Sequence, residues 1–130
     1  GAASNNRLDV FMEMRLAALL AKGTAGDPTL LPAHTVLEMA TVRAARALGI
    51  EDRVGTLAPG KLADMAAVNL RALELAPCYD PVSHLVYAAG REHVSHVWVN
   101  GELLVDHGQL TRLDARELAA KAAYWQERIS

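Results

Sequence analysis

Residues 46–70 read RALGIEDRVGTLAPGKLADMAAVNL, and the character of the sequence changes within this stretch. Upstream of it, apolar residues recur at the spacing of helices. Inside it, Gly55 and Pro59-Gly60 separate short apolar runs. Because glycine and proline interrupt helices and favour turns, we predict a strand at about 53–57, a turn, and a second strand at about 63–70. The chain therefore passes here from helices to a sheet.

Two helices are predicted upstream of this stretch. Over residues 8–22 the apolar side chains fall near one face at 3.6-residue spacing, and Gly23 can take the left-handed conformation that ends a helix. The polar stretch Ser4-Asn5-Asn6 offers side-chain oxygens that can cap the first turn. A second helix is predicted over residues 33–48, with Gly49 at its end.

Three further elements are predicted downstream. Residues 81–90 favour a short helix, because a proline is well placed in a first turn. Residues 94–110 read VSHVWVNGELLVDHGQL, where Asn100-Gly101 between two apolar runs predicts a hairpin with a type I′ turn. Asp114 and Glu117 form the capping-box pattern of a last helix.

Together these elements define an α/β chain with four main helices and about four short strands. So small a sheet offers little surface to cover helices of this apolarity. The elements resemble part of a larger object, and the apolar residues on the first two helices extend beyond a single stripe. We expect these helices to need a further covering surface.

Composition excludes several classes of function. The chain has 130 residues, is 52% hydrophobic and 22% charged, and carries a net charge of −2, as in an ordinary folded domain. No basic patch suggests nucleic-acid binding, and no apolar run is long enough for a membrane span. The single cysteine, Cys78, excludes an internal disulfide and favours a reducing cytoplasm.

His93 and His96 invite a zinc interpretation. On a strand, however, an odd separation places two side chains on opposite faces, and no cysteine or carboxylate lies beside them at ligand spacing. We therefore interpret them as surface or loop histidines. His84 and Tyr87 lie three residues apart on one helix, where packing is the expected role.

Other reactive residues have ordinary interpretations. Gly60-Lys61 lacks the rest of the phosphate-binding loop pattern and fits a turn with a solvated lysine. Cys78 has no neighbouring base and is expected to be inert. Asp9, Glu13 and Arg15 have the spacing of surface ion pairs across helix turns.

The opening residues, GAASNN, differ from these because small and polar residues let a ligand approach the backbone closely. Capping a helix accounts for one of the three residues Ser4, Asn5 and Asn6. A functional and a structural role are equally open at this point.

Three separated stretches resemble the amidohydrolase superfamily. Residues 46–70 resemble the segment, with its V-G-x-L-x-P-G-K-x-A-D pattern, in which that chain leaves a metal-bearing barrel and enters a small β-sandwich. Residues 94–110 resemble a later sandwich hairpin with a V-x-V-N-G turn. Residues 1–23 resemble the segment after the last barrel strand, most of all in the 5-methylthioadenosine/S-adenosylhomocysteine deaminase group. Chlorotriazine hydrolases and 8-oxoguanine deaminases are relatives that tend to have Ser-Asn-Asp where this chain has Ser4-Asn5-Asn6.

This resemblance implies the C-terminal part of a (β/α)8 TIM barrel together with strands of the β-sandwich. Residues 1–50 would be the last βα loop and the terminal barrel helices. Residues 51–76 would be a sandwich hairpin and residues 77–92 a helix returning to the barrel. Residues 93–112 would be the later hairpin, and residues 113–130 the C-terminal helix.

The resemblance also implies a function for the intact protein, namely deamination of an adenosine-type nucleoside with release of ammonia. The family uses a divalent metal, commonly zinc, and an Asp that is a metal ligand would lie just before Gly1. The resemblance therefore implies that this chain contains no catalytic group and no metal ligand. It also implies that the chain binds no metal and is inactive alone. Ser4 would contact the substrate in the eighth βα loop, while Asn5 and Asn6 would brace the loop and cap the helix.

Two alternatives remain beside this prediction. The first is a sibling chemistry, such as a chlorohydrolase or a deaminase of another heterocycle. The second is a non-catalytic module that associates with itself. The expected partners are the N-terminal part of the enzyme or a second copy, with a nucleoside substrate for the intact enzyme and neither nucleic acid nor membrane.

Overall fold

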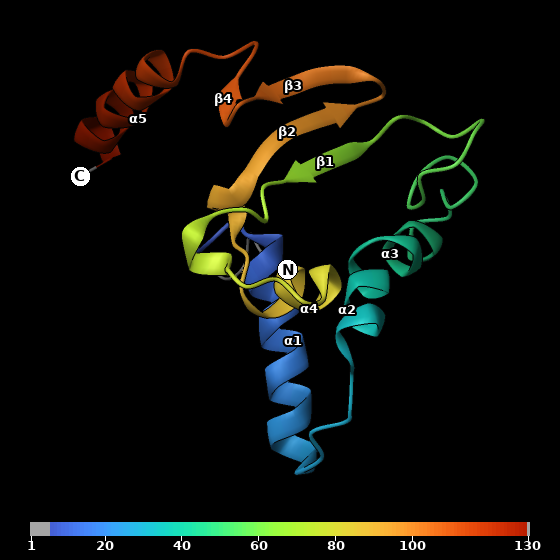
Figure 1. Ribbon diagram of the computed structural model, residues 1–130. Helices are drawn as coiled ribbons and strands as arrows, with labels where there is room; N and C mark the ends of the chain where they lie inside the picture. The colour runs from blue at the N-terminus through green and yellow to red at the C-terminus, as the bar shows by residue number, and fades with distance from the viewer. Residues whose placement is uncertain (1–5, 130) are drawn as a thin grey trace.

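Helices and strands occupy separate parts of the molecule (Figure 1). The structure is a computed structural model that describes residues 6–129. The helices are α1 Val10–Ala25, α2 Ala33–Ala40, α3 Val42–Ala47, α4 Pro81–Tyr87 and α5 Ala115–Ile129, with short 3-10 turns at Leu73–Leu75 and Arg91–His93. The strands are β1 Met65–Val68, β2 Val94–Val99, β3 Glu102–Asp106 and β4 Gln109–Leu110. None of the helices within residues 6–129 is both long and apolar enough to cross a membrane.

Helix α1 begins two residues later and ends three residues later than the sequence predicts. Asp9 is its N-cap, with a side-chain oxygen that accepts from the Met12 N–H at 3.3 Å. The predicted cap at Ser4-Asn5-Asn6 is therefore wrong: Asn6 has a left-handed φ of 56° ahead of the helix, and Ser4 and Asn5 lie outside the described residues. Gly23 lies inside the helix, at a cost of about 1 kcal/mol relative to alanine, and Gly26 (φ 65°) ends it instead.

The predicted helix over residues 33–48 is two helices, α2 and α3, separated at Thr41. The Thr41 hydroxyl donates to the Leu37 carbonyl at 2.8 Å, a local bond that competes with helix continuation. The predicted end at Gly49 is confirmed. Gly49 has φ 68°, and the N–H groups of Gly49 and Ile50 donate to the last helical carbonyls at 3.0 Å each.

The predicted strand at 53–57 is wrong, and residues 53–64 form an irregular loop before β1. One backbone hydrogen bond links its arms, from the Leu62 N–H to the Arg53 carbonyl at 2.8 Å. Gly55 takes φ 92° and lies so close to α3 that a Cβ there would stand 2.9 Å from the Ala45 Cβ. A left-handed residue pressed against a helix does not continue a strand, so the loop packs on α3.

The four strands form one antiparallel sheet in the order β1-β2-β3-β4. The predicted hairpin is confirmed, because Asn100 (φ 52°) and Gly101 (φ 79°) both take the positive φ that a type I′ turn requires. Trp98 pairs with Leu103, but Val97 pairs with Val105. The β2–β3 ladder therefore contains a bulge with one extra residue on β3.

The small apolar core lies between α1, α2 and α4, and its buried members are Met14, Ala18, Ala33, Val36 and Val86. Arg15 of α1 ties this core to the end of α4: its guanidinium donates to the Val86 carbonyl at 3.3 Å and to the Ala89 carbonyl at 2.8 Å. Carbonyls at a helix C-terminus lack intrahelical partners, so a cation there satisfies them. Asp9 pairs with Arg7 at 3.1 Å.

Helix α5 stands apart from the other helices (Figure 1), and none of its side chains is buried. Asp114 caps it as predicted, accepting from the Arg116 N–H at 2.7 Å. Glu117, the second member of the predicted capping box, pairs with Lys121 at 2.7 Å. The helix leaves Leu118, Tyr124 and Trp125 largely exposed.

Gly55 and Gly60 offer a matched pair of substitutions, because their φ angles are 92° and 87° but only Gly55 has close neighbours. Gly60→Ala should cost about 1–2 kcal/mol for the left-handed backbone alone. Gly55→Ala should cost a further ~1–3 kcal/mol for overpacking against α3. Denaturant unfolding of the purified protein measures both, and equal losses would contradict the packing of this loop on α3.

Candidate functional site

The predicted substrate contact, Ser4, lies outside the described residues, as does Asn5. The described chain begins at Asn6, which is exposed and precedes the capped start of α1. Asp9 at that start is buried and engaged by the Arg7 side chain and the Met12 N–H. The described part of the opening loop thus leads into α1 through a capped and ion-paired turn.

His93 is buried, and both of its ring nitrogens have partners. Its Nδ1 accepts from the Gly90 N–H at 3.0 Å, so the ring proton of the neutral form resides on Nε2 and points to the Glu74 carboxylate, also at 3.0 Å. The pKa of Glu74 is held below its usual value, first by its own backbone N–H and then by His93. With both nitrogens engaged, His93 is a structural residue, and because it is buried the interpretation as a surface or loop histidine is wrong for it.

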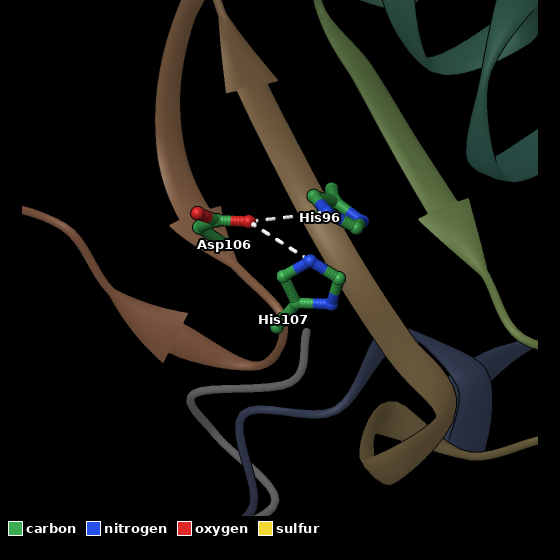
Figure 2. A group of neighbouring side chains, drawn as sticks. All are labelled: His96, Asp106 and His107. Atoms are coloured by element: carbon green, nitrogen blue, oxygen red, sulfur yellow. Dashed lines mark ion pairs between the residues drawn. The ribbon is translucent and has the colours of Figure 1, made fainter.

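His96 belongs to a cluster that the sequence analysis missed. Its Nε2 lies 3.1 Å from Oδ1 of Asp106, and Nε2 of His107 lies 3.8 Å from the same oxygen. Figure 2 shows both rings turned toward the carboxylate, from β2, the end of β3 and the turn that follows it. Because the bulge adds a residue to β3, it moves Asp106 opposite His96. The signal in the sequence was the pair Asp106-His107 directly before Gly108.

An apolar groove of about 500 Å³ separates the helices from the sheet. Phe11, Met14, Leu37, Leu48, Ile50 and Met65 are among its lining residues. Asp64 is the one carboxylate among them, and it accepts from the Asn100 N–H at 2.6 Å. The groove therefore offers packing surface and no group poised for acid–base chemistry.

The remaining reactive side chains act in local structure. Lys61 donates to the carbonyls of Glu51 and Val54, so it braces the loop and is not merely solvated. Cys78 is exposed. The Nδ1 of His84 lies 3.1 Å from the Asp80 carbonyl.

Comparison with known proteins places this geometry in a family. Residues 1–104 match the Amidohydrolase family. A 5-methylthioadenosine/S-adenosylhomocysteine deaminase of Teredinibacter turnerae is 49% identical over 99% of the chain, and the chain spans 29% of that relative's length.

Solved structures agree with this match. An adenosine deaminase from Xanthomonas campestris with bound zinc superposes with a TM-score of 0.95 at 47% identity, over 99% of this chain and 29% of that one. An atrazine chlorohydrolase from Arthrobacter aurescens, solved with zinc, gives 0.76 at 30% identity, over 88% of this chain and 25% of that one. The predicted fold, part of a TIM-barrel hydrolase, is confirmed by these neighbours.

The His93–Glu74 contact predicts a pH dependence of stability. Because the folded pKa of Glu74 is depressed, its ionised form stabilises the protein above the unfolded pKa, and that contribution is lost as pH falls through the folded pKa. Glu74→Gln should lower the Tm near pH 7, and the difference from wild type should shrink toward pH 3. Thermal unfolding across this range measures it, with Glu127→Gln on α5 as the control. A constant difference at all pH values would contradict this role of the carboxylate.

Proposed function

This chain belongs to the amidohydrolase family, and from that premise we propose that the intact protein deaminates an adenosine-type nucleoside by hydrolysis. The substrate class proposed is 5-methylthioadenosine or S-adenosylhomocysteine. The observation that carries the proposal is the 49% identity to a deaminase of that name over almost the whole chain. The TM-score of 0.95 to an adenosine deaminase supports it. The single cysteine, Cys78, supports a reducing compartment such as the cytoplasm.

The proposed cofactor is one divalent metal, with zinc the first choice because two of the solved relatives contain it. Such a metal activates water for attack on the purine ring. Neither His93 nor Asp64 fits that catalytic centre, because His93 has both nitrogens engaged and Asp64, the one carboxylate of the groove, is bonded to a backbone N–H. We therefore assign the catalytic ligands to the part of the protein outside this chain.

This chain's own contribution to the reaction is a substrate-facing loop and a surface for the rest of the barrel. In the proposed division, residues 1–50 complete the barrel, residues 51–76 and 93–112 belong to the sandwich, and residues 77–92 return to the barrel. Residues 113–130 form the C-terminal helix. The apolar groove supports this division, because such a surface on a folded protein is normally covered by a partner.

A second candidate function is a sibling hydrolysis, such as dechlorination of a triazine. The observation in its favour is the TM-score of 0.76 to an atrazine chlorohydrolase. The identity of 30% to that enzyme, against 47% to the adenosine deaminase, favours deamination. Ammonia release from 5-methylthioadenosine, compared with chloride release from atrazine by the same intact protein, separates the two.

Ser4 provides a test of the opening loop in the intact enzyme. A serine hydroxyl can both donate and accept, and one neutral hydrogen bond contributes about 0.5–1.5 kcal/mol. Ser4→Ala should lower kcat/KM for the nucleoside by roughly threefold to tenfold at unchanged metal content. Unchanged kcat/KM together with a lowered Tm would assign Ser4 to the fold instead.

Separate expression tests the division of the protein. The 130 residues alone should not deaminate 5-methylthioadenosine, and should associate with the preceding part of the enzyme or with themselves through the groove. Co-expression with that preceding part should restore activity. Light scattering measures association, and ammonia release measures activity. A monodisperse monomer that unfolds cooperatively would argue against the proposal that the apolar groove must be covered by a partner.

A further inference from the structure

We propose that His96, Asp106 and His107 form a site for a divalent transition metal on the sheet, separate from the metal centre assigned above to the rest of the protein. One ligand atom from each residue lies within 4.8 Å of the others. All three side chains come from the β2–β3 ladder and the turn before β4, and Figure 2 shows them converging on one point. The proposal does not depend on the substrate of the intact enzyme.

The spacing of the three side chains is close to that of a ligand set. Zinc binds nitrogen and oxygen at about 2.0–2.2 Å in tetrahedral geometry, which sets neighbouring ligand atoms roughly 3.3 Å apart. The two imidazole-to-carboxylate distances are 3.1 and 3.8 Å. Small rotations of the two rings would therefore bring all three atoms to one ion. The His107 side chain is 84% exposed and free to make that adjustment.

The hydrogen bonds around His96 favour the neutral tautomer that carries its proton on Nδ1. The Ser95 hydroxyl has one proton, and it donates that proton to the Ala67 carbonyl at 3.2 Å. It must then accept from Nδ1–H of His96, which lies 2.9 Å away. In this tautomer of the neutral ring, Nε2 presents a lone pair toward the Asp106 carboxylate 3.1 Å away, and a proton or a metal ion between the two atoms makes that contact favourable.

This proton arrangement is the reverse of that at His93. There a backbone N–H occupies Nδ1, and Nε2 carries the proton toward Glu74. Both nitrogens of His93 have partners that need no metal, whereas His96 is oriented as metal-binding histidines are, with Nδ1 fixed by a neighbour and Nε2 facing the Asp106 carboxylate. Ser95 is the positioning residue that fixes the tautomer.

The backbone also holds the three groups together. The bulge brings Asp106 opposite His96, and His107 takes a left-handed φ of 46° at the start of the turn before Gly108. The His96 ring stacks on Trp98 with a centroid separation of 5.5 Å and an interplanar angle of 11°. Two of the three ligands are thus held by the sheet, and the third approaches from the turn.

Two imidazoles and one carboxylate favour zinc, copper, nickel or iron over magnesium or calcium, which prefer oxygen ligands alone. Three protein ligands leave at least one position for water or for a donor from another molecule. The expectation that this chain binds no metal came from the family resemblance and from the lack of a ligand set of three at workable spacing in the sequence, whereas the structure brings His96, Asp106 and His107 together.

Zinc itself is the probe for the test. The intact protein, already zinc-loaded at its catalytic centre, is equilibrated with added zinc, and bound metal is counted by elemental analysis. We expect a second equivalent per chain. His107→Ala and Asp106→Asn should lose it, with affinity reduced at least about tenfold, and Ser95→Ala should weaken it by about 10- to 100-fold. Calcium in place of zinc should not bind.

His34→Ala is the matched control, because His34 is exposed on α2, and it should keep the second equivalent. Imidazole NMR locates the ion, since added zinc should shift the His96 and His107 resonances and leave that of His34 unchanged. Deaminase activity is measured on the same samples, so that loss of the second metal is distinguished from loss of the first. A wild-type protein with no second equivalent, or one retained by both His107→Ala and Asp106→Asn, would overturn the proposal.

Discussion

The contact of Arg15 with the end of α4 links the parts of this structure. The Arg15 guanidinium on α1 donates to the Val86 carbonyl in the last turn of α4, where helical carbonyls lack partners, and to the Ala89 carbonyl just beyond it. Immediately afterwards the chain turns through Arg91–His93 and enters β2. Arg15 thus holds the end of α4 against α1 at the point from which the chain enters β2, the strand that carries His96 and one arm of the hairpin.

Local signals in the sequence predicted local structure well. Asn100-Gly101, Gly49 and the proline that begins α4 were each identified correctly, because a turn or a helix end depends on the conformational limits of one or two residues. The break at Thr41 and the loop at 53–57 were missed, because they depend on a side-chain bond and on contact with α3. The resemblance supplied the barrel and the sandwich, which no local pattern contains.

Prediction of the candidate site failed for a related reason. Side-chain alternation was applied to His93 and His96, but His93 lies in the 3-10 turn before β2, and alternation cannot reveal the bulge in β3 that lies beside the contact of Asp106 with His96. Sequence patterns are equally unable to predict which ring nitrogens of His93 and His96 carry protons. Gly90 offers an N–H to the His93 ring, whereas the Ser95 hydroxyl, which donates to the Ala67 carbonyl, favours a proton on Nδ1 of His96. Such partners are set by the folded backbone.

The order of the elements has a mechanical consequence. The chain runs from α3 to β1, returns to α4 and then passes to β2, so it crosses between the helices and the sheet at three places. A hinge works when the connections between two bodies lie near a single axis and a few residues absorb the rotation. Three crossings, with Arg15 bracing the last of them, leave no such axis. A rotation of the sheet against helices α1–α4 would therefore have to bend all three connections together.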